Sequence, residues 1–169
     1  MSVTVRSRFL LWGGAAFVVA LDQLTKAWVV RHLPAYTPVD WIPQLASLFS
    51  FTFVKNTGVA FGLFPQLGGI FTVLSAIVIL GIMLFHRAIA GTDLWIYGGL
   101  GLVTGGASGN LLDRLMRGYV VDFIDVNFWP LREWPVFNLA DSAIVVGVAI
   151  LLFDAFFLSE KKVVTDATV

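Results

Sequence analysis

The sequence has no cysteine, and this absence excludes three kinds of site. Without a thiol there is no cysteine nucleophile, no disulfide and no thiolate ligand for a metal. The two histidines, His32 and His86, lie far apart and belong to no HExxH-like pattern. We therefore expect no metal and no cofactor.

Charged residues are scarce as well. They make up 13% of the 169 residues, against about 25% in soluble domains. The net charge is zero, so nothing in the charge balance predicts binding to nucleic acid. Hydrophobic residues reach 58%, and the mean hydropathy is +0.86. These values are typical of a protein that crosses a membrane several times.

Four apolar segments approach the roughly 20 residues that a membrane helix needs. They cover about residues 9–30, 67–85, 94–112 and 136–158. Basic residues precede the first segment, as in a signal peptide, but no small-residue cleavage site follows it. We expect a mainly α membrane fold with four transmembrane helices, in one domain over residues 1–162.

An even number of spans places both termini on one side of the membrane. Basic residues number five on each side: Arg6, Arg8, Arg87, Lys161 and Lys162 against Arg31, Lys55, Arg114, Arg117 and Arg132. Assigning Arg114 to the third helix tips the positive-inside count towards cytoplasmic termini. Residues 163–169 would then form a cytoplasmic tail.

Two segments opposite the termini resemble strands. Residues 49–54 alternate aromatic and small side chains with period two, and Asn56-Thr-Gly58 follows as a turn signal. Residues 119–129 are rich in β-branched and aromatic residues. We expect a small sheet, built from about residues 39–62 and 119–129, to form a cradle on the extracytoplasmic membrane surface.

Ionisable residues inside membrane segments are costly and need a partner or a function. In the first segment, Asp22 and Lys26 are four residues apart, so they share a helix face and are expected to form an ion pair with a structural role.

The third segment has Gly101, Gly105 and Gly109 at a spacing of four, which favours close helix contact. Three polar residues follow on nearly the same face: Asn110, Asp113 and Arg114. Asp113 and Arg114 could cap the helix end, whereas Asn110 and Arg114 could face a substrate.

The fourth segment carries Asn138 and Asp141 on one face. Asp141 lies about five residues into that segment, or roughly 7 Å at 1.5 Å per residue. It could be a first-turn acid that the helix dipole favours. Asp122, in the strand-like segment on the same side, suggests instead a pair of carboxylates. In such a pair one group stays protonated while the other is ionised, which suits hydrolysis. Asp125 is the competing candidate, but in a strand it points away from Asp122.

Five blocks together resemble the lipoprotein signal peptidase (signal peptidase II) family. They are LDQLTK (21–26), KNTGVAFG (55–62), GGASGNLLDR (105–114), VVDF (120–123) and FNLADSAI (137–144), and they occur in the family's order and spacing. The resemblance implies an aspartyl endopeptidase of the bacterial inner membrane. Its substrates would be prolipoproteins that carry diacylglyceryl on a cysteine, cut on the amino side of that cysteine.

The resemblance also assigns residues. It implies that Asp122 and Asp141 are the catalytic dyad, and that a second set binds substrate or supports the dyad: Asn56, Gly106, Asn110, Arg114 and Asn138. Asp22, Lys26 and Asp113 would be structural. It further implies contact with membrane lipids and inhibition by the cyclic peptide globomycin, and a monomer would suffice. Phe49, Phe51, Phe53 and Phe61 could form an apolar wall for acyl chains, or simply pack.

Other functions remain open at this point. A proton-coupled transporter also buries Asp, Asn and Arg, but near the midplane and often in internal repeats. The GxGD signature of presenilin-like proteases is absent, and a lipid-phosphate phosphatase would need clustered Arg and His. A non-catalytic scaffold would leave the paired carboxylates unexplained.

Overall fold

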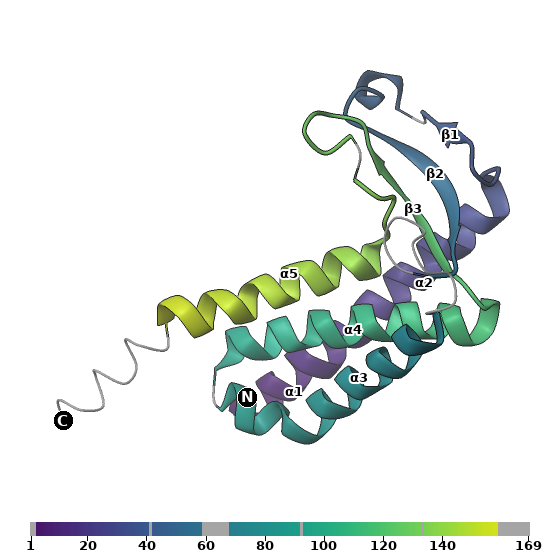
Figure 1. The fold of residues 1–169 in the computed structure, drawn as a ribbon. Coiled ribbons are helices and arrows are strands. Elements are labelled where there is room, and N and C mark those ends of the chain that lie inside the picture. The colour runs from purple at the N-terminus through teal and green to yellow at the C-terminus, as the bar shows by residue number, and fades with distance from the viewer. Residues whose placement is uncertain (1–2, 41, 59–67, 92, 133, 159–169) are drawn as a thin grey trace, which may run out of the picture.

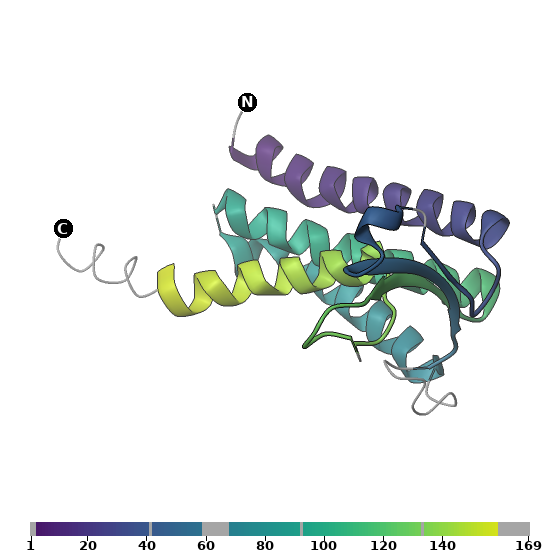
Figure 2. The same cartoon turned by 90° about the horizontal axis from the view of Figure 1, so that it is seen from above.

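Long helices run side by side with α4 in the middle, and a small sheet stands at one end of them (Figures 1 and 2). The computed structural model describes residues 3–40, 42–58, 68–91, 93–132 and 134–158. The first helix is α1 (Val3–Arg8), which continues through a π-helical turn (Phe9–Gly13) into α2 (Gly14–His32). The other helices are α3 (Gly68–Ala90), α4 (Leu94–Arg117) and α5 (Leu139–Phe153). A π-helical turn (Asp154–Leu158) extends α5. The start of α1 and the far end of α5 both lie away from the sheet (Figure 1).

The four predicted helices all exist, but their ends differ from the prediction. The first begins earlier, at Val3, and the second runs to Ala90. The third continues past residue 112 to Arg117, where Gly118 ends it with φ +76° and donates its N–H to the carbonyl of Arg114. The fourth starts at Leu139 rather than residue 136, because Asn138 caps it. Residue 67 and the predicted tail 163–169 lie outside the described residues.

Two helices in the described part of the chain are long and apolar enough to cross a membrane. These are Gly69–Ala90, with mean hydropathy 2.3, and Leu139–Leu158, with 2.1. The central helix α4 is less apolar because it is rich in glycine and polar residues, and it packs against α2, α3 and α5 at once.

Glycines let the helices approach α4 closely. A Cβ added to Gly105 would lie 2.6 Å from the Cβ of Val18 and 2.9 Å from the carbonyl oxygen of Ala15, both on α2. Gly101 and Gly109 meet the same helical stretch, which confirms the predicted stripe. Gly106 points elsewhere, against the carbonyl oxygen of Ala140 at the start of α5. The start of α5 can therefore sit directly on α4.

The sheet has three antiparallel strands in the order β1 (Pro38–Val39), β2 (Phe49–Asn56) and β3 (Val120–Val126). The predicted strand segments are thus confirmed in their central parts, whereas residues 59–62 lie outside the described residues. Asp122 pairs with Val54 and Asp125 with Ser50. A buried apolar cluster joins the sheet to the end of α2: Val29, Leu33, Phe53, Val121 and Phe123.

The close approach at Gly105 gives a matched pair of variants. Gly105→Ala forces α2 away from α4, and overpacking of this kind costs about 1–3 kcal/mol. Gly98→Ala makes the same chemical change in α4, where an added Cβ meets nothing within 4 Å. We expect the thermal midpoint in detergent to fall for Gly105→Ala and to stay level or rise slightly for Gly98→Ala, since Ala is the better helix former. Equal midpoints for the two variants would contradict the close packing.

Candidate active site

Asp122 lies in the middle of β3 and is almost fully buried, with 2% of its surface exposed. Each of its carboxylate oxygens accepts a hydrogen bond from a side-chain amide. Asn138 Nδ2 donates to Oδ1 at 2.7 Å, and Asn56 Nδ2 donates to Oδ2 at 2.8 Å. Asn56 is itself fixed, because its Oδ1 accepts the N–H of Gly58 at 3.0 Å. The carboxylate is thus held in one orientation.

Asp141 is the third residue of α5 and belongs to a capping box. Its backbone N–H donates to Asn138 Oδ1 at 2.9 Å, and its Oδ2 accepts the N–H of Asn138 at 3.2 Å. Its Oδ1 accepts from Asn110 Nδ2 at 2.7 Å. Asp141 is therefore a first-turn acid, which was one interpretation of the sequence. It is also linked to Asp122, because Asn138 forms hydrogen bonds with both residues.

All four carboxylate oxygens of the pair accept an N–H from the protein. A carboxylate oxygen has two lone pairs, so each keeps capacity for a further contact. Both residues line one cavity of about 610 Å³. Asp125 points elsewhere and accepts from Thr52 Oγ1 at 2.6 Å.

Burial raises the pKa of Asp122 to about 7, and the negative charge of Asp141 adds to this rise. The hydrogen bonds from Asn56 and Asn138 and the charge of Lys26 act in the opposite direction but do not cancel it. Near neutral pH, Asp122 can therefore hold a proton while a second carboxylate faces the same cavity. Such a pair can accept a proton and donate one in a single cycle.

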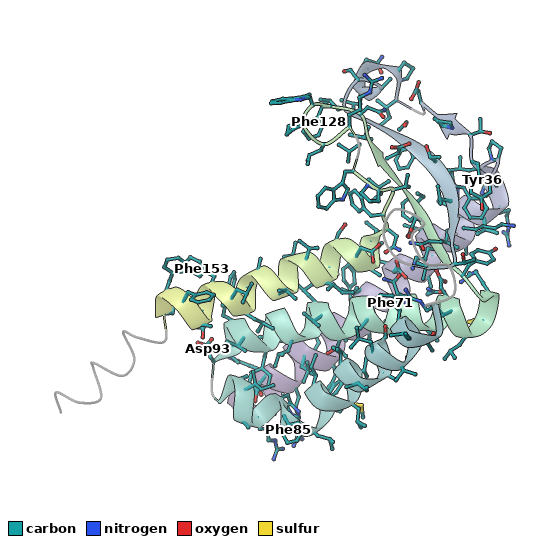
Figure 3. All side chains as sticks on the ribbon, in the orientation of Figure 1. Tyr36, Phe71, Phe85, Asp93, Phe128 and Phe153 are labelled. Atoms are coloured by element: carbon teal, nitrogen blue, oxygen red, sulfur yellow. The ribbon has the colours of Figure 1, made fainter. Side chains whose placement is uncertain are left out.

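The cavity opens between α3, the segment before α5, and α5 itself. Arg114 lines it, with its guanidinium 5.9 Å from the ring centroid of Phe71. Phe71 lies at the start of α3 (Figure 3). The rest of the lining is mostly apolar and includes Trp134, Pro135, Val136, Phe137, Val145 and Val146. Within the described residues, no three His, Cys, Asp or Glu side chains gather as a metal site.

Behind the pair lies a fully buried ionic cluster. Lys26 Nζ is 2.9 Å from Asp22 Oδ2 and 3.1 Å from Asp113 Oδ2, and all three side chains have no exposed surface. The ion pair between Asp22 and Lys26 was predicted. Asp113 does not cap the end of α4, because that helix continues for another turn; it also pairs with Arg117.

The structure changes the expectation of an aromatic wall. Phe53 is buried in the apolar cluster, at 4% exposure, and Phe61 lies outside the described residues. Phe51 lines a different cavity of about 350 Å³ between the sheet and α2. Phe123, which follows Asp122 and so points to the other face of β3, lines that cavity too.

Sequence reasoning missed the apolar residues that line the cavity beside the carboxylates. Val145 could have been found, because it lies four residues after Asp141 and so shares its helix face. Phe71 and Trp134 carry no such signal, since only the folded chain brings them to the carboxylates. Gln23 was missed as well; it donates to Asp22 Oδ2, to the carbonyl of Gly109 and to Asp113 Oδ1.

Comparison with known proteins identifies the family of this chain. A family model described as signal peptidase (SPase) II matches residues 14–157. The lipoprotein signal peptidase of Psychromonas ingrahamii is 40% identical over 152 residues, which cover 88% of this chain and 85% of the relative. That of Shewanella oneidensis is 38% identical over 167 residues, 96% of this chain and 95% of the relative.

Two solved structures have a similar fold. A structure described as a bacterial membrane enzyme has a TM-score of 0.75 at 31% identity, over 87% of this chain and 90% of that chain. A second, described in the same way, has a TM-score of 0.76 at 29% identity, over 86% and 92%. The chain therefore belongs to the signal peptidase II family and is a peptidase.

Proposed function

We propose that this protein removes the signal peptide from prolipoproteins that carry diacylglyceryl on a cysteine, cutting on the amino side of that cysteine. The observation that carries the proposal is the pair Asp122 and Asp141, held by amide donors at the wall of a largely apolar cavity. A peptide bond beside a lipidated residue needs both a hydrolytic pair and an apolar surface. The relatives' name, lipoprotein signal peptidase, supports the same substrate class.

Asp141 acts as the base in this proposal. Its carboxylate lies at the N-terminus of α5, where the helix dipole favours a negative charge, and it accepts a backbone N–H from Asn138. Asp122 lies in a strand rather than in the first turn of a helix, and has a pKa of about 7, so in this proposal it holds the proton at rest.

The reaction then balances in two steps. Asp141 takes a proton from a water molecule, whose oxygen bonds to the scissile carbonyl carbon while Asp122 gives its proton to the carbonyl oxygen. In the second step Asp141 returns its proton to the leaving amide nitrogen. The C–N bond breaks as Asp122 recovers its proton from the hydroxyl of the tetrahedral intermediate. The side-chain partners Asn56, Asn110 and Asn138 keep both carboxylates oriented throughout.

Arg114 and Gly106 support the site differently. The guanidinium of Arg114 lines the cavity and can bind carbonyl oxygens of the substrate. Gly106 has no side chain and so leaves room for the backbone of Ala140, next to Asp141.

We further propose that α1–α2, α3, α4 and α5 are four membrane spans in one domain over residues 1–162, with residues 163–169 as a tail. The alternating direction of the helices, with the sheet at one end, supports this (Figure 1). The termini would be cytoplasmic and the sheet and dyad extracytoplasmic, in a bacterial inner membrane. One chain supplies both acids, so a monomer in contact with lipid suffices.

Replacing either acid by asparagine should abolish cleavage, because the amide keeps the shape of the side chain but cannot carry the proton. We expect rates to fall by about 10²–10⁴-fold for Asp122→Asn and Asp141→Asn. The assay is a gel shift of a diacylglyceryl-modified prolipoprotein with purified enzyme and a chelator present. Asp125→Asn is the matched control and should cleave like the parent. If Asp125→Asn were inactive and Asp122→Asn active, the catalytic carboxylate would be Asp125 and the assignment to Asp122 would be wrong.

Activity should decline as the pH rises through about 7. The pKa of Asp122 is raised from its ordinary value, so its proton is present below that pH and lost above it. Values of kcat/KM, obtained from initial rates between about pH 5 and about pH 9, would show this loss as a fall on the basic side of the pH profile. A constant rate across the upper half of that range would contradict the assignment of the proton to Asp122.

Globomycin should inhibit the enzyme, as the family resemblance implies. The same gel-shift assay, run with increasing globomycin, is expected to show loss of cleavage by the parent. Full cleavage at saturating globomycin would count against the proposed substrate class.

A further inference from the structure

The Lys26 ammonium has three N–H donors and three acceptors. Besides Asp22 Oδ2 and Asp113 Oδ2, it donates to Asn110 Oδ1 at 2.9 Å. The side chain has no exposed surface, so water does not share these contacts. The proposed reaction makes no use of this buried charge.

Two of these acceptors also hold the backbone next to the dyad. Asp22 Oδ1 accepts the N–H of Ala140 at 3.1 Å, and Ala140 immediately precedes Asp141. Asp113 Oδ2 accepts the N–H of Val121 at 2.9 Å, and Val121 immediately precedes Asp122. The same lysine therefore connects, through one carboxylate each, to the backbone amide before each catalytic aspartate.

The third acceptor leads to the dyad through a side chain. An ammonium can only donate, so the amide of Asn110 must turn its carbonyl oxygen towards Lys26. Its NH₂ group then points to Asp141 Oδ1, at 2.7 Å. Asn138 Nδ2 donates to the same Asn110 oxygen at 3.2 Å, which fixes this orientation further.

We propose that Lys26 is a positioning residue that sets the separation of Asp122 and Asp141 by holding β3 and the start of α5 through Asp113 and Asp22. This inference rests on the proposed function of the dyad. The two acids come from different elements, so their geometry depends on what holds those elements together. Displacing a catalytic group by about 1 Å can cost about 10²-fold in rate.

The test is a double variant that keeps the net charge. Lys26→Met/Asp22→Asn removes the ion pair, but the asparagine can still accept the N–H of Ala140, and Asp113 keeps its partner Arg117. The matched control, Lys55→Met/Asp125→Asn, makes the same two chemical changes in the sheet. Lys55 is exposed, and neither residue belongs to the cavity lining or the ionic cluster.

We expect kcat of the double variant to fall about 10²-fold with little change in KM, because the residues that bind substrate are untouched. The control should retain the parent kcat. Rates are taken per folded molecule, with the folded fraction measured by thermal unfolding in detergent. A merely structural role would lower the thermal midpoint and leave kcat per folded molecule unchanged.

Two outcomes would overturn the inference: parent kcat in the folded double variant, or a raised KM with kcat unchanged. Should the double variant not fold, Asp22→Ala alone decides, since it removes the acceptor between Lys26 and the N–H of Ala140 while Lys26 stays paired with Asp113; parent kcat in that variant also overturns the inference. Activity in Asp122→Asn would instead contradict the proposed catalytic dyad. A failure of the dyad proposal can therefore be told apart from a failure of the Lys26 proposal.

Discussion

A buried ammonium must have its charge balanced by protein groups, and this requirement shapes the centre of the molecule. Removing an ion from water costs several kcal/mol, which is recovered only when its partners are well placed. Around Lys26 those partners come from two helices, and their remaining contacts reach a third helix and the sheet. Elements that are distant in sequence thereby meet at one point, which lies directly behind the candidate dyad.

The helix α4 allows these elements to come together because its faces differ in composition. One face carries glycines that admit α2, another carries Gly106 and admits the start of α5, and the polar residues follow near the sheet end. A helix of this composition is poorly suited to face lipid, and α4 is instead surrounded by the other helices (Figure 2). The apolar helices α3 and α5 supply the hydrocarbon surface that α4 lacks.

Much of this arrangement follows from sequence patterns, because the patterns depend on local geometry. The spacing of Asp22 and Lys26 predicts their ion pair, and the alternation in residues 49–54 predicts a strand. The positions of Asp122 and Asp141 also suggest that the two carboxylates form a pair, but sequence patterns do not give most other partners across space. Asp113 reads as a helix-end residue until Val121 and Lys26 are seen beside it, and Phe71 reads as an ordinary lipid-facing residue until it is seen beside Arg114.

The capping box at the start of α5 restricts which amino acids position 138 can hold. Asparagine, aspartate, serine and threonine are ordinarily interchangeable at a helix N-cap, because each offers an oxygen to the backbone. Asn138 must also donate from Nδ2 to Asp122 while its Oδ1 accepts from Asp141. Ionised aspartate has no such donor and would add a negative charge beside Asp141, and the hydroxyl residues have one polar atom where two are needed. The N-cap of α5 therefore needs an amide side chain, because this one residue must both cap the helix and orient Asp122.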